Sequence, residues 1–238
     1  MPKKSPQSPA AGTVGPTVED TPHDLRSFGR RRGRKFSPRQ DQLWSQVLPR
    51  VRFNPAKLRD TKRPLWLEIG FGGGEHLVWQ AAFNQSVDIL GCEPFEDGVV
   101  KVLTAIDDRT LSNIFIHPDD ARFIIRTLSP ASIGRGFILF PDPWPKRRHI
   151  KRRLITAALL ADLARVLSPG AELRIGTDIE DYARTIFMAF NDDPHFTWSA
   201  SQAKDWQIRP DDWPETRYEA KAVREGRRSV YLSYRRRP

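Results

Sequence analysis

The chain has 238 residues, of which 39% are hydrophobic, so it is long enough for one large domain or two small ones with a sizeable core. Lysine and arginine number 39 against 29 acidic residues, and the formal charge of +10 favours a polyanionic partner such as nucleic acid or an anionic membrane surface. No apolar stretch is long enough to span a bilayer, no signal peptide follows the first lysines, and a single cysteine, Cys92, excludes an intramolecular disulfide. We therefore expect a soluble, cytoplasmic protein without a membrane anchor.

The N-terminal quarter of the chain divides into two parts by composition. Residues 1–25 are rich in Pro, Ser, Gly, Ala and Thr and show no periodic apolar face, which predicts a disordered tail. Residues 26–63 form a basic arm and lead-in that contains the run Gly29-Arg30-Arg31-Arg32-Gly33-Arg34-Lys35. Such an arm is either a solvated tail or a flexible clamp on phosphates, and the sequence supports both alternatives about evenly.

The third part, residues 64–238, alternates short apolar runs with amphipathic stretches. Strands are expected at Leu65–Ile69, Val87–Cys92, Ile114–His117, Gly136–Phe140 and Leu173–Gly176. Helical spacing is found at Glu75–Phe83, Glu96–Asp107, Ala121–Leu128, Lys151–Leu167 and Ile179–Phe190. Because strand–helix alternation implies parallel strands with right-handed crossovers, the expected fold class is α/β, an open doubly wound sheet with helices on both faces. Phe196–Trp198 and Val230–Tyr234 have no helical pattern between them and are expected to close the sheet as an antiparallel pair.

A glycine-rich turn follows the first expected strand, in Glu68-Ile69-Gly70-Phe71-Gly72-Gly73-Gly74-Glu75. Glycines let the chain turn sharply and bring backbone N–H groups close to a ligand at the carboxyl ends of parallel strands. The dinucleotide fingerprint requires a further glycine where this chain has Glu75, and Glu68 would place negative charge beside the phosphates. An adenosine ligand with positive charge tolerates that carboxylate, and S-adenosyl-L-methionine, with an amino group and a sulfonium, is such a ligand.

Two more carboxylates follow the next two expected strands. Glu93 ends the second strand, where an acid takes the ribose hydroxyls of an adenosine, and Asp120 follows the third, placed to accept the adenine amino group. Each of these residues alone is more often a helix N-cap. Acids at three successive strand ends, Glu68, Glu93 and Asp120, are better explained together by one nucleoside ligand.

The most informative segment is Phe140-Pro141-Asp142-Pro143-Trp144-Pro145-Lys146, which is followed by a dense basic run up to Arg153. Prolines restrict their neighbours to extended conformations, so Asp142 and Trp144 are expected on a stiff loop. A fixed carboxylate and an aromatic plate suit a flat polar ring, and the adjacent cations suit a phosphate backbone. The alternative is a proline-rich strand end followed by a solvated helix face. The density of unlike, chemically useful groups favours the functional interpretation.

Taken together, these residues resemble those of a known family. The turn at 68–74, with Glu93 and Asp120, resembles class I S-adenosylmethionine-dependent methyltransferases, which have a Rossmann-like, mostly parallel seven-stranded sheet with an antiparallel C-terminal strand. The segment Phe140–Leu154, with Gly176-Thr177-Asp178 and Thr216-Arg217-Tyr218-Glu219, resembles the bacterial tRNA (guanine-N7-)-methyltransferases, the TrmB family. The resemblance covers about residues 26 to 235 and implies a methyltransferase domain over residues 64–238.

The resemblance implies an activity and a set of roles. The activity would be methyl transfer from S-adenosyl-L-methionine to guanine N7 in tRNA, at position 46 of the variable loop, with Asp142 as the catalytic residue. The cofactor site would comprise Glu68, Gly70, Glu93, Asp120 and Asp142. The target nucleoside would be bound by Lys146, Asp178, Thr216, Arg217, Tyr218 and Glu219. The RNA would be contacted by Arg148, His149, Ile150, Lys151, Arg152 and Arg153.

The chemistry of guanine N7 fits these residues. N7 carries an in-plane lone pair and no proton, so it can attack a sulfonium methyl group directly, in line, with no obligatory general base. Orientation helps, and so does negative charge near a ring that becomes cationic. Asp142, Asp178 and Glu219 can accept hydrogen bonds from the guanine N1–H and amino group. Trp144 either stacks on the base or braces the loop, and His149 lies among cations that disfavour its protonated form.

Several alternatives stay open at this point. One is a methyltransferase that acts on another RNA or DNA base, since Asp142-Pro143-Trp144 is distantly like the acid-Pro-Pro-aromatic loop of amino-group methyltransferases. Another is a non-catalytic RNA-binding protein on this fold, against which the complete acidic set argues. The remaining histidines show no ligand spacing, so no metal is expected. A monomer and a homodimer both fit the sequence.

Overall fold

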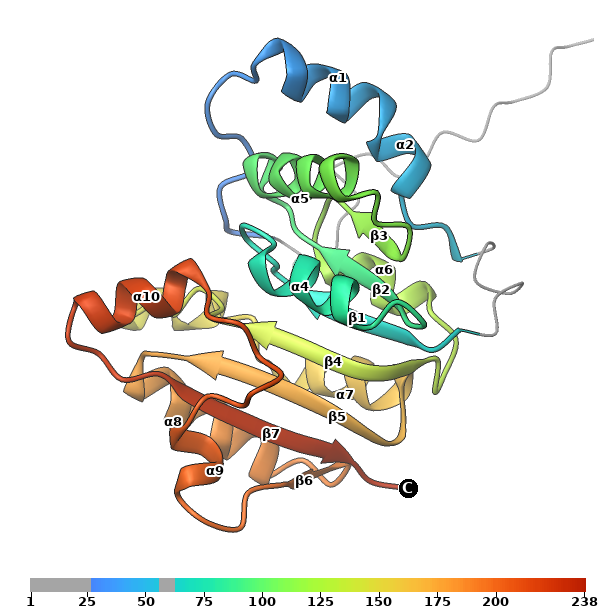
Figure 1. The fold of residues 1–238 in the computed structure, drawn as a ribbon. Helices are drawn as coiled ribbons and strands as arrows, with labels where there is room; N and C mark the ends of the chain where they lie inside the picture. Colours follow the sequence, from blue (N-terminus) through green and yellow to red (C-terminus); the bar gives the residue numbers. More distant parts are fainter. Residues whose placement is uncertain (1–26, 56–62) are drawn as a thin grey trace, which may run out of the picture.

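The computed structural model describes residues 27–55 and 63–238, and the tail expected at 1–25 lies outside these ranges. Its strands are β1 (Leu65–Ile69), β2 (Asp88–Cys92), β3 (Ile114–His117), β4 (Ile133–Leu139), β5 (Leu167–Thr177), β6 (Phe196–Trp198) and β7 (Val230–Arg236). They form one seven-stranded sheet with the order β3-β2-β1-β4-β5-β7-β6 (Figure 1). Strand β7 is antiparallel to both β5 and β6, and the other neighbouring pairs are parallel. The expected fold class is confirmed.

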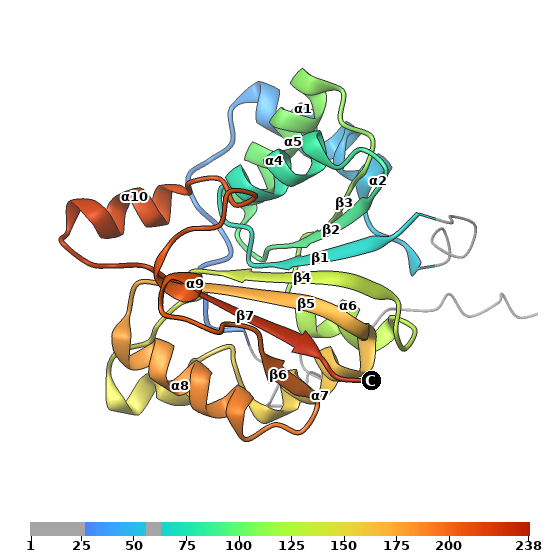
Figure 2. The same ribbon diagram turned by 60° about the horizontal axis from the view of Figure 1, so that its bottom comes forward.

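Helices cover both faces of this sheet (Figure 2). One face carries α1 (Pro38–Gln46), α4 (Glu75–Phe83) and α5 (Glu96–Arg109), and the other carries α6 (Ala121–Thr127), α7 (Ala157–Val166) and α8 (Glu180–Asn191). Further helices are α2 (Leu48–Val51), α9 (Lys204–Gln207) and α10 (Arg217–Arg224). Within the two described ranges, no helix is both long and apolar enough to cross a membrane.

The central strands are apolar because both of their faces are buried. Every residue of β2 is buried, and its side chains alternate between two cores. Leu90 packs with Leu67 and Ile138 in the core that includes α6, α7 and α8. Ile89 packs with Leu77 in the core that includes α1, α4 and α5. Burial of an aliphatic side chain of this size contributes about 1.5–3 kcal/mol, so the two cores fix the sheet between its helix layers.

The largest difference between expectation and structure concerns the helix expected over Lys151–Leu167. The basic run forms a separate 3₁₀ helix over Arg147–Arg152, and α7 begins only after Thr156, whose hydroxyl accepts a backbone hydrogen bond from α7 at 3.2 Å. The chain between the two helices has extended backbone at Arg153, and the side chains of Arg153 and Ile155 are buried. The expectation of one continuous helix was therefore wrong, because burial of these two side chains requires a non-helical connection.

The candidate site follows from the direction of the strands. Since β1, β2, β3, β4 and β5 run parallel, their carboxyl ends meet at one edge of the sheet. The chain leaves β1 for β2 on one side, while β4 lies on the other side, and ligands of open α/β sheets bind at such a switch point. The loops that follow β1, β2 and β4 at this edge carry the glycine turn, Glu93 and Asp142.

Asn113 ties the loops at the opposite edge of the sheet together. It is 3% exposed, and its side-chain amide donates to the carbonyl oxygens of Ala81, Asn84 and Val87 at 3.0, 3.2 and 3.0 Å. We expect Asn113→Ala to lower the free energy of unfolding by about 2–3 kcal/mol, because these interior carbonyls lose their donor. Urea denaturation measures this change. The matched control, Asn191→Ala at an exposed site, should shift stability by less than about 0.5 kcal/mol, and equal losses would contradict the assignment.

Candidate active site

The glycine turn after β1 opens onto the edge of the sheet. Gly70 and Gly72 have φ angles of 74° and 54°, which favour glycine. The N–H of Gly70 donates to the carbonyl oxygen of Cys92 at 2.8 Å, which ties the turn to the end of β2. A Cβ at Gly70 would meet no atom within 4 Å, whereas a Cβ at Gly72 would lie 2.9 Å from the ring of Tyr218. The turn therefore has one open side and one side covered by Tyr218.

Glu93 connects the end of β2 to the glycine turn. Its carboxylate accepts the N–H of Gly72 at 2.8 Å and the N–H of Phe95 at 2.9 Å. Burial raises the pKa of Glu93; the two backbone hydrogen bonds oppose this shift, and the negative charges of Asp142 and Glu68 add to it. The carboxylate is thus held rigidly between two loops, close to two other acids.

Glu68 and Asp120, the other two acids at strand ends, are 1% and 8% exposed. Glu68 is joined through Oε2 to Nδ1 of His76 at 2.7 Å. Asp120 caps α6 by accepting the N–H of Arg122 at 3.0 Å, and it forms an ion pair with the Arg122 guanidinium at 2.8 Å. The N-cap interpretation is therefore correct for Asp120, whereas the cap residues of α4 and α5 are Gly74 and Phe95.

The proline-rich loop after β4 is strained, which contradicts the expectation of extended backbone throughout. Phe140 and Trp144, each before a proline, have φ angles of 50° and 42°. Such conformations cost on the order of 1–3 kcal/mol per residue and persist only where the surroundings fix them. The N–H of Phe140 donates to the carbonyl oxygen of Gly176 at 2.7 Å, at the end of β5. Asp142, between the two strained residues, keeps part of its surface exposed, and partial desolvation of its carboxyl raises its pKa.

Arg153 braces this loop from inside the protein. Its guanidinium donates to the carbonyl oxygen of Pro143 at 2.9 Å and to the hydroxyl of Thr185 at 2.8 Å, and it pairs with Asp181. It also lies 4.7 Å from the ring centroid of Tyr182. Since only 5% of Arg153 is exposed, the RNA contact expected from the sequence is replaced by an internal role.

Trp144 is held by the basic 3₁₀ helix. The Arg152 guanidinium lies 5.0 Å from the ring centroid of Trp144 and 5.0 Å from that of Phe28, so it forms a cation–π contact with both rings. His149 meets Trp144 edge-on, with 5.8 Å between centroids. Desolvation and the neighbouring cations lower the pKa of His149. These contacts match the bracing alternative for Trp144.

The segment Thr216–Glu219 begins α10 with a capping box. The hydroxyl of Thr216 accepts the N–H of Glu219 at 3.3 Å, and the carboxylate of Glu219 accepts the N–H of Thr216 at 3.4 Å. That carboxylate also accepts the hydroxyl of Tyr231 and pairs with Arg209 at 3.1 Å. Glu219 is 4% exposed, so the protein itself occupies the group that was expected to contact guanine.

Tyr218 and Thr216 are the members of this segment that line a crevice beside the glycine turn. The Tyr218 ring is nearly parallel to that of Phe140, at 19° and 6.5 Å between centroids, and 44% of Tyr218 is exposed. With Glu68 and Gly70, these residues line a small cavity at the glycine turn. The aromatic pair therefore lies between the glycine turn and the proline-rich loop.

Three other residues expected at the nucleoside have different surroundings. Asp178 pairs with Arg227 at 2.6 Å and does not cap α8. Arg217 pairs with Glu75, and Lys146 is exposed beside the proline-rich loop. The structure brings Thr216 and Tyr218 to the cavity wall and places the charge of Asp142 near Glu93 and Tyr218.

The basic arm docks partly on the acidic loops. The carbonyl oxygen of Arg31 accepts the N–H of Glu96 at 2.9 Å, its guanidinium pairs with Asp119, and Arg32 pairs with Glu96 at 3.3 Å. The exposed cations of the arm also include Arg30, Arg34 and Lys35. Arg31 and Arg32 pair with protein carboxylates but keep exposed side chains, so both sequence alternatives, solvated tail and phosphate clamp, stay open for the arm.

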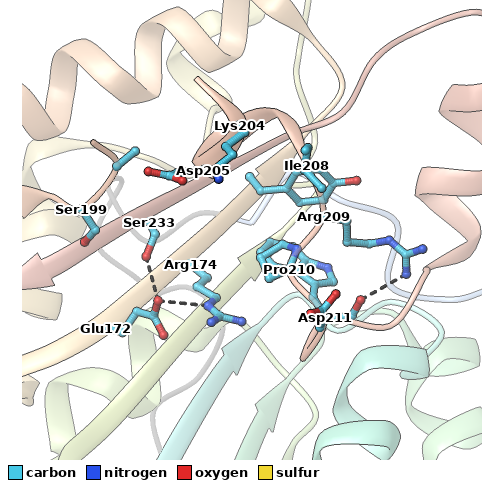
Figure 3. Close-up of a pocket in the computed structure, with 13 residues that line it drawn as sticks. Glu172, Arg174, Ser199, Lys204, Asp205, Ile208, Arg209, Pro210, Asp211 and Ser233 are labelled. Carbon is cyan, nitrogen blue, oxygen red and sulfur yellow. Dashed lines mark hydrogen bonds and ion pairs between the residues drawn. The ribbon is translucent and has the colours of Figure 1, made fainter. Parts of the chain in front are cut away.

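A larger cavity, of about 440 Å³, lies on β5 and β7 beneath the segment 199–213 (Figure 3). Glu172 in this cavity accepts the hydroxyl of Ser233 at 2.8 Å and pairs with Arg174 at 3.1 Å. The Glu172–Arg174 ion pair lies in its wall, and the cavity contains neither the glycine turn nor the acids at the strand ends. Size alone therefore does not make it the candidate active site.

Comparison with known proteins identifies the family. A family model described as "Putative methyltransferase" matches residues 62–232. A tRNA (guanine-N(7)-)-methyltransferase of Rhodospirillum rubrum is 44% identical over 232 residues, which cover 92% of this chain and 91% of that protein. The protein of the same name from Hyphomonas neptunium is 44% identical, over 84% of this chain and 94% of that protein. The chain belongs to the tRNA (guanine-N7-)-methyltransferase family.

Solved structures confirm the class I fold of this methyltransferase. A 16S rRNA methyltransferase, KamB, superposes with a TM-score of 0.53 at 15% identity, over 86% of this chain and 96% of that chain. A precorrin-6y C5,15-methyltransferase from Geobacter metallireducens gives a TM-score of 0.50 at 12% identity, over 76% of this chain and 85% of that chain. At these identities the likeness concerns the fold alone.

Sequence reasoning missed several residues around the site of this methyltransferase. His76 contacts Glu68, and Arg209 and Tyr231 hold Glu219, yet none of the three belongs to a recognisable spacing. Arg153 was grouped with the exposed cations because it follows them in the sequence. A usable signal was the spacing of Arg153 and Ile155. They are two positions apart, as are residues on the same buried face of an extended segment.

The different roles of Arg153 and Arg148 in this methyltransferase can be separated by experiment. We expect Arg153→Met to lower the free energy of unfolding by about 3 kcal/mol, since a buried, fully bonded cation leaves its partners unsatisfied. Its effect on the salt dependence of tRNA binding should be small. Arg148→Met, at an exposed site, should leave stability unchanged and reduce the log–log salt slope by about one unit. Urea denaturation and tRNA binding at varied salt measure both, and a reduced salt slope in stable Arg153→Met would contradict the internal role.

Proposed function

We propose that the chain transfers the methyl group of S-adenosyl-L-methionine to N7 of a guanine in tRNA, in the variable loop at position 46. The observation that carries this proposal is the 44% identity to a tRNA (guanine-N(7)-)-methyltransferase over 92% of the chain. The geometry supports it, because the acids, the aromatic pair and the exposed cations meet at one edge of the sheet. The domain boundaries proposed from the sequence, an arm over 26–63 and a catalytic domain over 64–238, accord with this arrangement.

The residues at the strand ends fit S-adenosyl-L-methionine. Gly70 opens onto free space, and Glu68 and Glu93 are buried carboxylates that are bonded to a histidine and to backbone N–H groups and not to an arginine or lysine, which suits a cationic ligand. Glu93 would hold the ribose diol, Glu68 the amino group, and Asp120 the adenine amino group through Oδ2, which also accepts the Arg122 guanidinium. When bound, the cofactor supplies an electrophilic methyl group.

The residues around the crevice suit a guanine that loses no proton. Asp142 is exposed, lies on a strained and braced loop, and can accept the guanine N1–H and amino group. Tyr218, beside Phe140, offers a ring on which the base can stack. Asp178 is a further acceptor for the base in this proposal, and Glu219 holds Thr216 in the cavity wall through the capping box. Because N7 has no proton, these groups need only orient the base and stabilise the positive charge that develops on it.

The tRNA backbone is proposed to contact the exposed side of the 3₁₀ helix. Arg148, Ile150 and Lys151 are exposed there, with Lys146 at its start. Arg152 and His149 contact the RNA in this proposal through the edges that Trp144 does not cover. A cytoplasmic location follows from the tRNA substrate, and the chain works as a monomer or a homodimer.

The proposed activity is tested with the purified chain, an unmodified tRNA transcript and labelled S-adenosyl-L-methionine. Nucleoside analysis should show 7-methylguanosine, and Asp142→Asn should lower kcat by about 10²-fold without loss of stability, as for loss of one oriented electrostatic group. Asp192→Asn, at an exposed site in the C-terminal half, is the control and should keep full activity. A methyl group on another base would favour the rival substrate, and binding of tRNA without any methylation would favour the non-catalytic alternative.

A second test uses the raised pKa of Glu93. Glu93 is protonated on acidification at a higher pH than an ordinary glutamate, and a protonated carboxyl loses part of its capacity to accept the ribose hydroxyls. Cofactor affinity should therefore be complete above this raised pKa and should fall as the pH drops through it. Calorimetry with S-adenosyl-L-methionine measures the curve. Glu93→Gln should bind about tenfold more weakly at pH 7 and show a flatter pH dependence, and parallel curves would contradict the assignment.

A further inference from the structure

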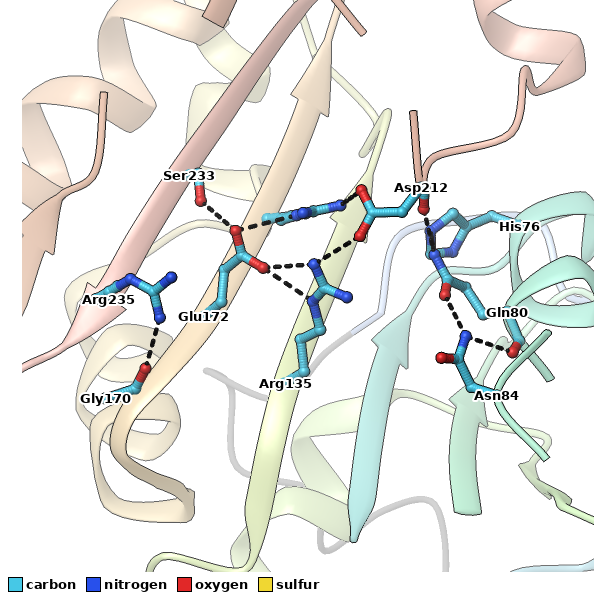
Figure 4. Close-up of polar contacts among 10 residues, drawn as sticks. His76, Gln80, Asn84, Arg135, Gly170, Glu172, Asp212, Ser233 and Arg235 are labelled. Atoms are coloured by element: carbon cyan, nitrogen blue, oxygen red, sulfur yellow. Dashed lines mark hydrogen bonds and ion pairs between the residues drawn. The ribbon is translucent and has the colours of Figure 1, made fainter. Parts of the chain in front are cut away.

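A chain of hydrogen bonds leads from Glu68 through His76 and Gln80 to the backbone of Asp212. The side-chain Nε2 of Gln80 lies 2.7 Å from the carbonyl oxygen of Asp212 and 3.1 Å from Nε2 of His76 (Figure 4). The Gln80 Oε1 accepts the side-chain amide of Asn84 at 3.0 Å, and the same amide donates to the carbonyl oxygen of Gln80 at 2.9 Å. A carbonyl oxygen only accepts, so both amide groups have one possible orientation.

The orientation of Gln80 determines the protonation of His76. The amide nitrogen of Gln80 is a donor only, so Nε2 of His76 must be the acceptor of this contact. The single ring proton of His76 is then on Nδ1, which donates to Oε2 of Glu68 at 2.7 Å. An imidazolium would direct a second N–H against the Gln80 amide, so the geometry selects neutral His76 beside the carboxylate.

The surroundings keep this chain of bonds dry. Glu68, His76 and Gln80 are 1%, 2% and 1% exposed. The His76 ring meets the ring of Phe137 at 4.6 Å and that of Trp213 at 5.9 Å, both edge-on. In such surroundings a lost hydrogen-bond partner is not replaced easily by water.

We infer that His76 is a positioning residue that, with its tautomer fixed by Gln80, holds Glu68 in place for the positively charged amino group of the cofactor. The inference rests on the proposed function, in which Glu68 holds that group. A neutral donor fixes one carboxylate oxygen and leaves the full negative charge, whereas an arginine in the same place would cancel the charge that the ligand needs. Glu68 and His76 both line the small cavity at the glycine turn, where the amino group would lie.

The same bonds connect the cofactor site to the loop that precedes α10. The Asp212 carboxylate pairs with Arg135 at 3.0 Å and with Arg174 at 2.6 Å, which anchors this loop to β4 and β5 (Figure 4). Trp213, next along the chain, covers His76, and Thr216 follows three residues later in the cavity wall. His76 and Gln80 thereby connect Glu68 by hydrogen bonds to the loop that carries Thr216, which is part of the cavity wall.

The test compares two ligands that differ in the amino group. S-adenosylhomocysteine carries the amino-acid part, and 5′-methylthioadenosine lacks it. We expect His76→Leu to weaken S-adenosylhomocysteine binding about tenfold in calorimetry and to leave 5′-methylthioadenosine binding unchanged. His76→Asn, whose amide can replace the Nδ1 donor, should restore most of the affinity. An equal loss for both ligands, or no rescue by asparagine, would overturn the positioning role in favour of general packing.

Glu68→Gln separates this inference from the proposed function. If Glu68→Gln leaves S-adenosylhomocysteine affinity unchanged, the placement of the amino group at Glu68 is wrong. If it weakens binding while His76→Leu does not, the cofactor placement holds and the role of His76 is overturned. The expected result is non-additivity, in which His76→Leu has little further effect in the Glu68→Gln background. Nitrogen-15 NMR of the His76 ring gives an independent readout, since a proton on Nε2 would contradict the assigned tautomer even where a variant folds poorly.

Discussion

Buried carboxylates at the ends of β1 and β2 impose a constraint that shapes the rest of the site. A buried charge must be hydrogen-bonded, yet an arginine beside it would occupy the place of a cationic ligand. Glu93 meets both conditions with two backbone N–H groups, and Glu68 meets them with a neutral histidine. In the larger cavity, by contrast, Glu172 is paired with arginines. The chemistry of the acids, and not the size of the cavity, distinguishes the candidate active site.

The basic residues in the described part of the chain include buried ones that form internal bonds and exposed ones that remain in contact with solvent. Arg153 and Arg174 are largely inside the protein and serve as braces, one beneath the proline-rich loop and one beneath the loop before α10. Arg148 and Lys151 are exposed on the 3₁₀ helix beside the crevice. The formal charge of +10 therefore indicates the class of partner but not the residues that bind it, because internal ion pairs contain many of the cations.

The proline-rich loop illustrates how strain and bracing belong together. Phe140 and Trp144 have backbone conformations that are unfavourable for their residue types. Arg153 bonds the backbone of this loop from below, and Arg152 packs on the Trp144 ring. These contacts fix the backbone on both sides of Asp142, which in the proposed function would orient a base that loses no proton.

The sequence by itself determined the fold class, the family and the edge of the sheet at which the site lies. These follow from local patterns: the alternation of strands and helices, the glycine turn, and acids at the ends of successive strands. Only the tertiary structure decided which side chains are free to act. Arg153 is buried against α8, Glu219 is locked by Arg209, and Gln80 is bonded to a carbonyl group 132 residues away. The physical reason is that a polar side chain takes the partner that packing brings to it, and packing joins segments whose separation along the chain leaves no periodic signal.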